Sequence, residues 1–275
     1  MVVRKFLCCV ALKDLEHYKV SATDGDIGSV VNFFIDDERW IIRYLIVETG
    51  GFLHRHWVLI SPIAFGPIDW STRRFHLSLT VDKIKNSPTV DVDKPVSRQH
   101  EMDYNGYYGY PYYWDYPGVW GMAVYPASLA SGSWNEGPAE PTDNSGDVHL
   151  RSANEVRGYR IQGSDGAIGH VDDFIVDDET WEVRYLVVDT SDGWFGKKLL
   201  LAPQWAQRVG WLESKVYVSM TREQIKNSPT CKPTDAINRV YEAHLYDYYG
   251  RPAYWDGDDR RAAVPPSRQS GSDSK

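Results

Sequence analysis

The sequence predicts a mainly β protein built from two tandem small β-barrels, each followed by a short C-terminal helix and an aromatic segment. One observation behind this prediction is an internal repeat: the segment from Asp24 to Thr49 returns from Asp165 to Thr190, at a separation of 165 − 24 = 141 residues. Another is the alternation of apolar and polar residues in short runs between turns, which is typical of half-buried strands. Because the separation stays constant across a whole unit, we interpret the chain as two copies of one fold.

The chain of 275 residues is long enough for two domains of roughly 100 residues each. The repeat places the first barrel with its helix at residues 1–115 and the second at residues 148–255. Between them, residues 116–147 are rich in Gly, Pro, Ser and acidic residues, which is typical of a flexible linker. Residues 256–275 have little to bury and are predicted to be disordered. We expect the two barrels to face one another across a pseudo-two-fold contact.

Turn signals separate the expected strands of each copy. An Asp-Gly turn, at Asp24-Gly25 and again at Asp165-Gly166, closes the first predicted hairpin. Two extended runs then flank a turn of consecutive acids, which is Asp36-Asp37-Glu38 in the first copy and Asp177-Asp178-Glu179 in the second. Further strands are predicted at 58–60 and 75–79 and, in the second copy, at 199–201 and 216–220.

Two helical segments are expected after the strands of each copy. Thr221 and Gln224 have the spacing of a capping box, and Thr80 stands at the matching place in the first copy, so a short helix is predicted there. A longer helix should end at Gly109 and at Gly250. In the second copy, the helical face that we expect to pack on the open end of the barrel carries Ile237, Tyr241, His244 and Tyr248.

Composition and charge exclude several classes of function. The net charge of −8 argues against nucleic-acid binding, because contact with phosphates requires a basic face. Apolar runs stay well short of the roughly 20 residues of a membrane-spanning helix, so we expect no integral membrane segment and leave peripheral association open. The three cysteines, with Cys8 and Cys9 adjacent, do not make a disulfide framework. We therefore expect a cytoplasmic protein.

Clustered carboxylates in the two acidic turns could act as metal ligands or as general acid and base. We favour a turn role, because an aspartate at such a position accepts hydrogen bonds from nearby backbone amides. His54 and His56 have no histidine counterparts in the second copy, where Phe195 and Lys197 stand. The sequence also has no phosphate-binding loop, dinucleotide fingerprint or nucleophile elbow. We expect no enzyme, and no catalytic residue, metal site or cofactor.

Arg43 and Arg184 interrupt apolar strands at matching positions, and a charge there needs a partner. We favour an ion pair at the barrel surface with an acid on the adjacent strand, such as the acid of the preceding hairpin; the alternative is ligand recognition. The aromatic segments after the barrels either cover their own domain or present an interaction surface, since Tyr and Trp are frequent at interfaces. With the two arginines, the candidate interaction residues are Tyr107, Tyr108, Tyr112, Trp114, Tyr248, Tyr249 and Trp255.

The run DGDIGSVVNFFIDD…WIIRYLIVET…WVLISP and its second copy DGAIGHVDDFIVDD…WEVRYLVVDT…KLLLAP resemble the PRC-barrel family. This small β-barrel is named after the cytoplasmic domain of the photosynthetic reaction-centre H subunit, and the C-terminal half of a bacterial ribosome maturation factor has the same fold. The resemblance covers roughly residues 12–90 and 153–231. It implies a docking module without an active site common to its members, so it assigns no functional residue.

On this basis we expect a bacterial, non-enzymatic adaptor that docks on or assembles a protein complex, binds an unidentified protein partner and forms homo-oligomers. One alternative is a peripheral component of membrane redox or photosynthetic reaction-centre machinery. The other is a small-ligand or metal-binding protein that uses the acidic turns, the two arginines and the aromatic residues.

Overall fold

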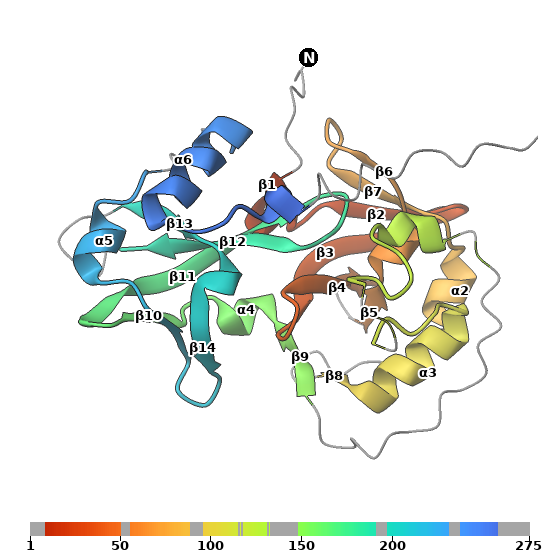
Figure 1. Cartoon of the computed structure of the whole chain (residues 1–275). Helices are drawn as coiled ribbons and strands as arrows, with labels where there is room; N and C mark the ends of the chain where they lie inside the picture. The colour runs from red at the N-terminus through yellow and green to blue at the C-terminus, as the bar shows by residue number, and fades with distance from the viewer. Residues whose placement is uncertain are drawn as a thin grey trace, which may run out of the picture.

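The computed structural model describes residues 9–50, 56–88, 96–114, 116, 118–130, 132, 148–190, 197–230 and 237–257. These residues form a mainly β structure with two sheets, one built largely from each half of the chain (Figure 1). The sheets lie side by side, and the long helices lie on the outside of the molecule (Figure 1).

The first half contains short strands and helices separated by tight turns. Its helices are α1 (Leu12–Leu15), α2 (Val81–Lys85) and α3 (Arg98–Tyr108), with 3₁₀ turns η1 (Pro62–Ala64) and η2 (Pro126–Leu129). Its strands are β1 (Cys9–Ala11), β2 (Lys19–Ala22), β3 (Gly25–Asp36), β4 (Ile41–Thr49), β5 (His56–Ile60), β6 (Phe65–Asp69), β7 (Arg74–Leu77) and β8 (Val96–Ser97).

The second half repeats the order from β1 to α3, except that its described residues have no counterpart of β8 before the long helix. Its helices are α4 (Ala153–Val156), α5 (Arg222–Lys226) and α6 (Arg239–Tyr249), with 3₁₀ turns η3 (Pro203–Trp205) and η4 (Tyr254–Gly257). Its strands are β9 (Val148–Ser152), β10 (Arg160–Gly163), β11 (Gly166–Asp177), β12 (Val183–Asp189), β13 (Lys198–Leu201), β14 (Ala206–Gly210) and β15 (Lys215–Val218).

The two sheets have the same strand order. It is β5-β4-β3-β2-β7-β6 in the first half and β13-β12-β11-β10-β15-β14 in the second. Within the described residues no ladder joins the edge strands β5 and β6, or β13 and β14, so the closed barrels predicted from the sequence are not detected. The chain leaves these edges through Pro62 and Pro203, which have no backbone amide to donate to a ladder.

A short strand from each half extends the sheet of the other half. β1 pairs antiparallel with β11, with Val10 opposite Val176. β9 pairs antiparallel with β3, with Arg151 opposite Ile35. Because positions 10 and 151 are related by the repeat, as are 35 and 176, the exchange is reciprocal. Figure 1 shows β1 and β9 where the two halves meet.

The predicted pseudo-two-fold contact between the halves is present. Ile41 forms an antiparallel bridge with Glu182, its own counterpart in the repeat. Backbone hydrogen bonds of 2.9 and 2.7 Å flank this bridge. Glu16 and Arg157 are also counterparts, and they form an ion pair. Since a residue meets its own counterpart only near a two-fold axis, these pairs mark the axis that relates the halves.

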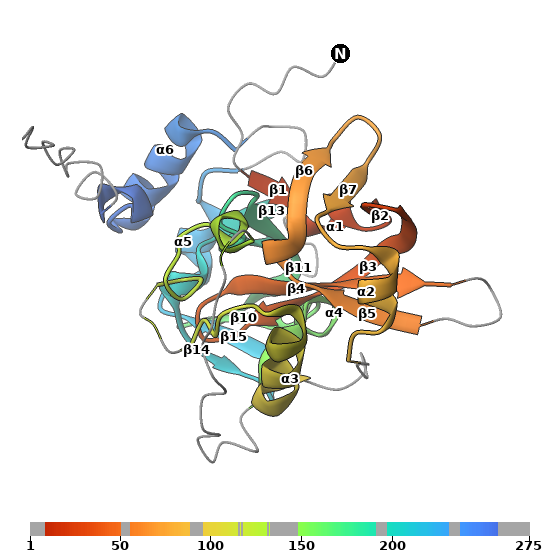
Figure 2. The same cartoon turned by 90° about the vertical axis from the view of Figure 1, so that its right-hand side faces the viewer.

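The interior is shared between the halves. One hydrophobic cluster includes Ile41 and Phe75 from the first half together with Trp181 and Val183 from the second. A second cluster lies beneath α3, which Figure 2 shows beside β4 and β5. In this cluster Tyr104 packs with residues of β4 and β5. The two units predicted as separate domains are therefore joined by common packing.

Local signals at the helix ends are confirmed. Thr221 and Gln224 form the predicted capping box, and Thr80 caps α2 in the first half. Gly109 and Gly250 end the long helices with left-handed φ values of 73° and 59°. Glycine is favoured there because it has no side chain to clash in that conformation.

The predicted buried face of the second long helix is wrong at two of its four positions, since Ile237 and Tyr241 are partly buried and pack against the core. In α6, His244 and Tyr248 are exposed, whereas Glu242, Leu245 and Tyr246 are buried. The glutamate faces inward because two tyrosine hydroxyls donate to its carboxylate at 2.8 and 3.0 Å. A helical pattern of apolar residues cannot predict a buried glutamate, because the side chains that donate hydrogen bonds to it lie far away in the sequence.

The first hairpin turns one residue earlier than predicted. The register of β2 and β3 makes Thr23-Asp24 the two-residue loop. The Asp24 carboxylate accepts a hydrogen bond of 2.7 Å from the first amide of α2, which connects the hairpin to that helix. Gly28 is needed further along β3, because a Cβ there would lie 1.8 Å from the carbonyl oxygen of Glu48.

The first part of the predicted flexible linker is packed, so that prediction is wrong for residues 118–130. Trp120 is 2% exposed and Leu129 is 3% exposed. The Trp120 indole donates to the Thr180 carbonyl at 2.7 Å, which attaches this segment to the second half. Aromatic burial of this kind outweighs the local preference for coil. Residues 133–147 of the predicted linker and 258–275 of the predicted tail lie outside the described residues.

Candidate interaction groove

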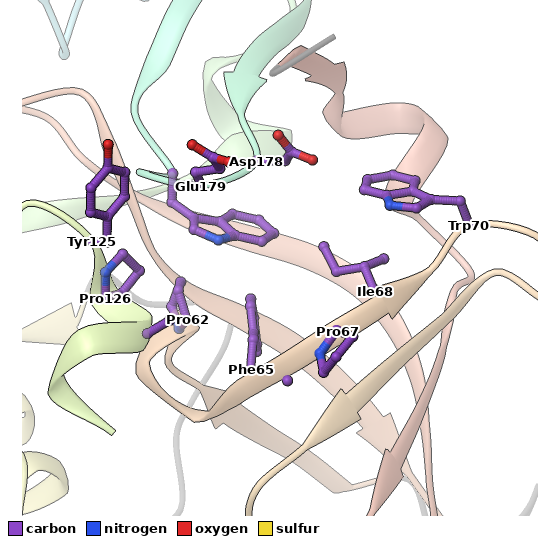
Figure 3. A pocket seen from close by; sticks show the side chains of 12 residues that line it. Pro62, Phe65, Pro67, Ile68, Trp70, Tyr125, Pro126, Asp178 and Glu179 are labelled. Carbon is purple, nitrogen blue, oxygen red and sulfur yellow. The ribbon is translucent and has the colours of Figure 1, made fainter. Parts of the chain in front are cut away.

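A groove lies between strand β6 of the first half and the β11–β12 turn of the second half (Figure 3). Its volume is about 540 Å³. Trp70 and Tyr125 lie at opposite ends, and the carboxylates of Asp178 and Glu179 lie across from Ile68 (Figure 3). The groove is therefore apolar along one side and acidic along the other.

Trp181 forms the floor of the groove and is itself buried, with 2% of its surface exposed. Its ring centroid lies 5.0 Å from that of Phe65 on β6 and 6.2 Å from that of Phe75 on β7. The residue has a φ of 62°, which is unfavourable for a bulky side chain and is held here by the hairpin turn. A tryptophan from the second half thus packs on strands of the first half, so the groove requires both halves to be folded.

The acidic turn is held by its own first residue. The Asp177 carboxylate accepts hydrogen bonds from the Glu179 and Thr180 amides at 3.0 and 2.9 Å. This confirms the turn role predicted for the clustered acids. It leaves Asp178 half-buried and Glu179 exposed at the groove edge.

A metal role for these acids has no support among the residues that the structure describes. No group of three or more His, Cys, Asp or Glu side chains in that part of the chain could hold an ion. His54 and Cys8 lie outside the described residues, and His56 is exposed at the start of β5.

The segment from Gly118 to Tyr125 closes one end of the groove. Arg39 donates to the Gly118 carbonyl at 2.8 Å and holds the segment against the first half. Tyr125 is 49% exposed, and the nearby Met122 and Val124 are 48% and 40% exposed. Large apolar side chains exposed this close together are typical of an interaction surface.

Arg43 and Arg184 pair with the acid of the preceding hairpin, as the favoured interpretation predicted. Arg43 donates to Asp36 Oδ2 from Nε at 3.0 Å and from Nη2 at 2.7 Å. Arg184 pairs with Asp177 at 2.9 Å. Arg43 is 1% exposed and lies inside the fold, so it is neither at the predicted barrel surface nor where a partner could reach it. Arg184 keeps a 16% exposed side chain.

The surroundings of Asp36 keep it ionised. Burial by itself would raise the pKa of Asp36, but the charge of Arg43 and hydrogen bonds from the Arg39 and Glu38 amides lower the pKa overall. The Arg43 guanidinium also lies 3.5 Å from the centre of the Tyr113 ring. The pair is therefore a structural ion pair enclosed by aromatic packing.

A buried glutamate anchors each long helix to its sheet. Glu101 of α3 accepts hydrogen bonds from Tyr113 at 2.8 Å and from Tyr44 at 3.3 Å. Burial, together with the charge of Glu101, raises the pKa of Tyr44 and Tyr113 well above the usual value, so both hydroxyls stay protonated donors. In the second half, Glu242 accepts from tyrosines at the matching positions. The repeat thus retains a buried network that holds the helix in place.

The tyrosines predicted as interaction residues on the long helices make internal contacts. Tyr107 donates to the Lys83 carbonyl at 2.8 Å, and Tyr248 donates to the matching Gln224 carbonyl at 2.7 Å. Their neighbours also pack inward: Tyr108 lies 4.7 Å from Tyr104, and Tyr249 lies 4.9 Å from Trp205, between ring centres. These residues connect helices and sheet, and none of the four predicted tyrosines lines the groove.

The remaining predicted interaction residues cover their own halves. Tyr112 is 8% exposed and stacks on Trp114 with ring centres 4.8 Å apart. The Arg98 guanidinium lies 4.1 Å from the Trp114 ring, and the Arg239 guanidinium lies 4.1 Å from the Trp255 ring. This matches the covering role that the sequence left as one of two possibilities for the aromatic segments.

The sequence interpretation missed the groove residues themselves. Trp70 and Trp181 were visible as positions where tryptophan recurs in both copies, but only as markers of the repeat. Tyr125 lies in the segment assigned to the linker, and Ile68 lies in a strand that the period-2 pattern did not reveal. The recurrence of a tryptophan beside a turn in both copies was the one feature of the sequence that could have pointed to these groove residues.

Comparison with known families matches the second half. A protein-family model for the PRC-barrel domain matches residues 149–227. The chain contains a PRC-barrel domain. This match stops short of the first half, although that half has the same strand order as the PRC-barrel domain. No curated protein matches the chain. In the part of the chain that the structure describes, helices are too short or too polar to cross a membrane.

Proposed function

We propose that this protein is a non-enzymatic adaptor in which two PRC-barrel repeats present a docking groove to a protein partner. The main observation behind this proposal is the groove, where apolar side chains of β6 lie close to Trp181 and the exposed Tyr125. The carboxylates of Asp178 and Glu179 line one edge of it. An aromatic centre with a charged border is typical of protein interfaces. The PRC-barrel domain supports a general interaction role.

We extend the proposal to the first half, which we take to be a second PRC-barrel repeat. Its support is the identical strand order and the reciprocal exchange of β1 and β9. Homo-oligomers, a cytoplasmic location and the alternative of a peripheral component of reaction-centre machinery stay predictions. The alternative of a small-ligand or metal-binding protein also stays a prediction.

The test is photo-crosslinking in the native cell. A photoreactive phenylalanine replaces Tyr125 at the end of the groove and, in a control, Leu212, which is fully exposed on the β14–β15 turn. We expect a protein adduct from position 125 that is absent at position 212. The adduct partner, identified by mass spectrometry and purified, should bind the wild-type chain and L212D but not I68D.

Two results would count against the adaptor. Position 125 giving no protein adduct above the control would leave the groove without a protein partner. A purified partner that binds I68D as tightly as the wild type would place its contact elsewhere.

A further inference from the structure

The two long helices end in the same backbone arrangement but carry different side chains just beyond their final glycines. Position 110 is tyrosine in the first half, and its counterpart at position 251 is arginine. The Tyr110 amide donates to the Asn105 carbonyl at 2.9 Å, and the Arg251 amide donates to the matching Tyr246 carbonyl at 3.1 Å. Both side chains therefore start from equivalent backbone positions, and their surroundings can be compared directly.

In the first half, the Tyr110 ring lies flat on the ring of Tyr108. The ring centres are 5.4 Å apart and the ring planes meet at 10°. Tyr110 also packs against both hydrophobic clusters, and Tyr108 is only 7% exposed. The first half thus covers this tyrosine with an aromatic ring from its own chain.

Tyr249, the counterpart of Tyr108, has a different set of ring neighbours. The ring centre of Tyr248 lies 5.0 Å away with the planes at 83°, and that of Trp205 lies 4.9 Å away with the planes at 52°. Within the described part of the chain, no ring lies parallel to Tyr249 as Tyr110 lies to Tyr108. Tyr249 is accordingly half-buried, whereas Tyr108 is buried.

The change from tyrosine to arginine leaves a pocket beside Tyr249. Arg251 is exposed, and its Nη2 donates to the Ser219 hydroxyl at 3.1 Å instead of covering the ring. The pocket has a volume of about 360 Å³. Of the described residues that line it, Arg251 alone is charged, so the pocket is positive. These lining residues are Ser219, Met220, Gln224, Tyr248, Tyr249 and Arg251.

We propose that this pocket binds an aromatic carboxylate, with its ring stacked on Tyr249 and its carboxylate paired with Arg251. The ring would take the place that Tyr110 takes in the first half. Offset stacking is a preferred arrangement of aromatic pairs, and hydrogen bonds between a guanidinium and a carboxylate are strong and directional. The volume lies at the lower end of the range for small-molecule sites. Because this pocket shares no lining residue with the groove, the proposal does not depend on the docking function.

The probe is para-hydroxyphenylacetate, which carries a phenol ring and a carboxylate. It is titrated into the isotopically labelled full chain, and NMR follows the Gly250 amide and the Arg251 Nε signals. We expect both signals to shift and to saturate. The neutral analogue para-hydroxyphenylacetamide should bind about tenfold more weakly, because it cannot pair with the guanidinium as an anion. Cyclohexylacetate, which keeps the charge and has no aromatic ring, should bind about fivefold more weakly.

Three variants of the chain test the assigned site. R251Y gives the second half the residue of the first half and should block the probe, because the chain's own ring then covers Tyr249. R251Q removes the charge and should weaken binding of the carboxylate about tenfold, with little effect on the neutral analogue. R239Q is the charge-matched control and should bind normally, because Arg239 lies at the other end of α6, about 15 Å away. Far-ultraviolet circular dichroism checks that each variant is folded.

The same chemistry could come from a free compound or from a protein chain with a tyrosine beside an acidic residue. A peptide with the sequence Tyr-Asp between glycines, titrated in parallel, distinguishes these sources. Tighter binding of the peptide would assign the site to a protein chain, and tighter binding of the free probe would assign it to a small molecule.

Several results would overturn the proposal. Equal binding of the probe and cyclohexylacetate would exclude stacking, and equal binding of the probe and its amide would exclude the charge pair. Undiminished binding to R251Y would place the probe elsewhere on the molecule. The absence of any shift at millimolar probe would leave the pocket without this class of ligand. None of these results bears on the groove, which is tested separately by crosslinking at position 125.

Discussion

The two repeat arginines offer a comparison of burial within one chain. In R43M the guanidinium is replaced by an apolar side chain of similar length, and Asp36 Oδ2 loses both of its hydrogen bonds from Arg43. Asp36 is 2% exposed, so water cannot replace them. Leaving a buried charge without its partner costs about 3–5 kcal/mol of unfolding free energy.

The matched variant is R184M. Here the side chains of Arg184, Asp177 and Glu182 are 16%, 12% and 25% exposed, so water partly solvates the acids that remain. We expect a loss of about 1–2 kcal/mol. The difference between the two variants, about 1–4 kcal/mol, corresponds to roughly a fivefold to thousandfold change in the unfolding equilibrium constant.

Urea unfolding followed by far-ultraviolet circular dichroism measures both losses. We expect one transition because the halves share a hydrophobic interior, and a lower midpoint at unchanged slope in each variant. The double variant D36N/R43M should recover part of the loss, because both charges are then gone. Equal losses in R43M and R184M, or a loss below about 1 kcal/mol in R43M, would refute the argument from burial.

Three further predictions concern acid stability, a glycine and the pseudo-two-fold axis. Because the pKa of Asp36 is lowered in the folded chain from its ordinary value of 3.8, its contribution to stability is complete above that value and is lost as the pH falls through the folded pKa. Unfolding free energies measured below pH 4 should therefore depend less on pH in D36N than in the wild type, and an identical pH dependence would contradict this. In G28A, the new Cβ would clash with the backbone of β4, so the midpoint temperature of thermal unfolding should fall by many degrees. In G106A, the new Cβ in α3 meets no atom within 4 Å, so this variant should be neutral or stabilising by up to about 1 kcal/mol. Equal midpoint temperatures for the two glycine variants would contradict this, because they would show that the contact between position 28 and the β4 backbone relaxes at little cost in stability. E16R places two arginines together at the axis and should destabilise the fold. In a double-mutant cycle the double exchange E16R/R157E should restore only part of the loss, because Arg157 also pairs with Asp173, which the exchange leaves beside a second carboxylate. Losses that simply add would exclude a direct pair between positions 16 and 157.

Several features of this protein could be predicted from the sequence because they depend on neighbours in the chain. The Thr221 and Gln224 capping box and the glycine ends of the long helices depend on backbone geometry within a few residues. The acidic turns also depend on close neighbours, since the Asp177 carboxylate accepts hydrogen bonds from the amides two and three residues further along the chain. The repeat predicted two copies of one topology, and both sheets have it.

Sequence alone determined the repeat, the acidic turns and the helix caps; the turns and caps are specified by residues close in the chain. Tertiary structure decided the exchange of β1 and β9, the inward position of Arg43 and the inward face of α6. It also decided the groove, whose Ile68, Tyr125 and Trp181 come from three distant segments. Long-range contacts of this kind depend on which surfaces meet when two sheets pack across an axis, and no local pattern encodes that choice.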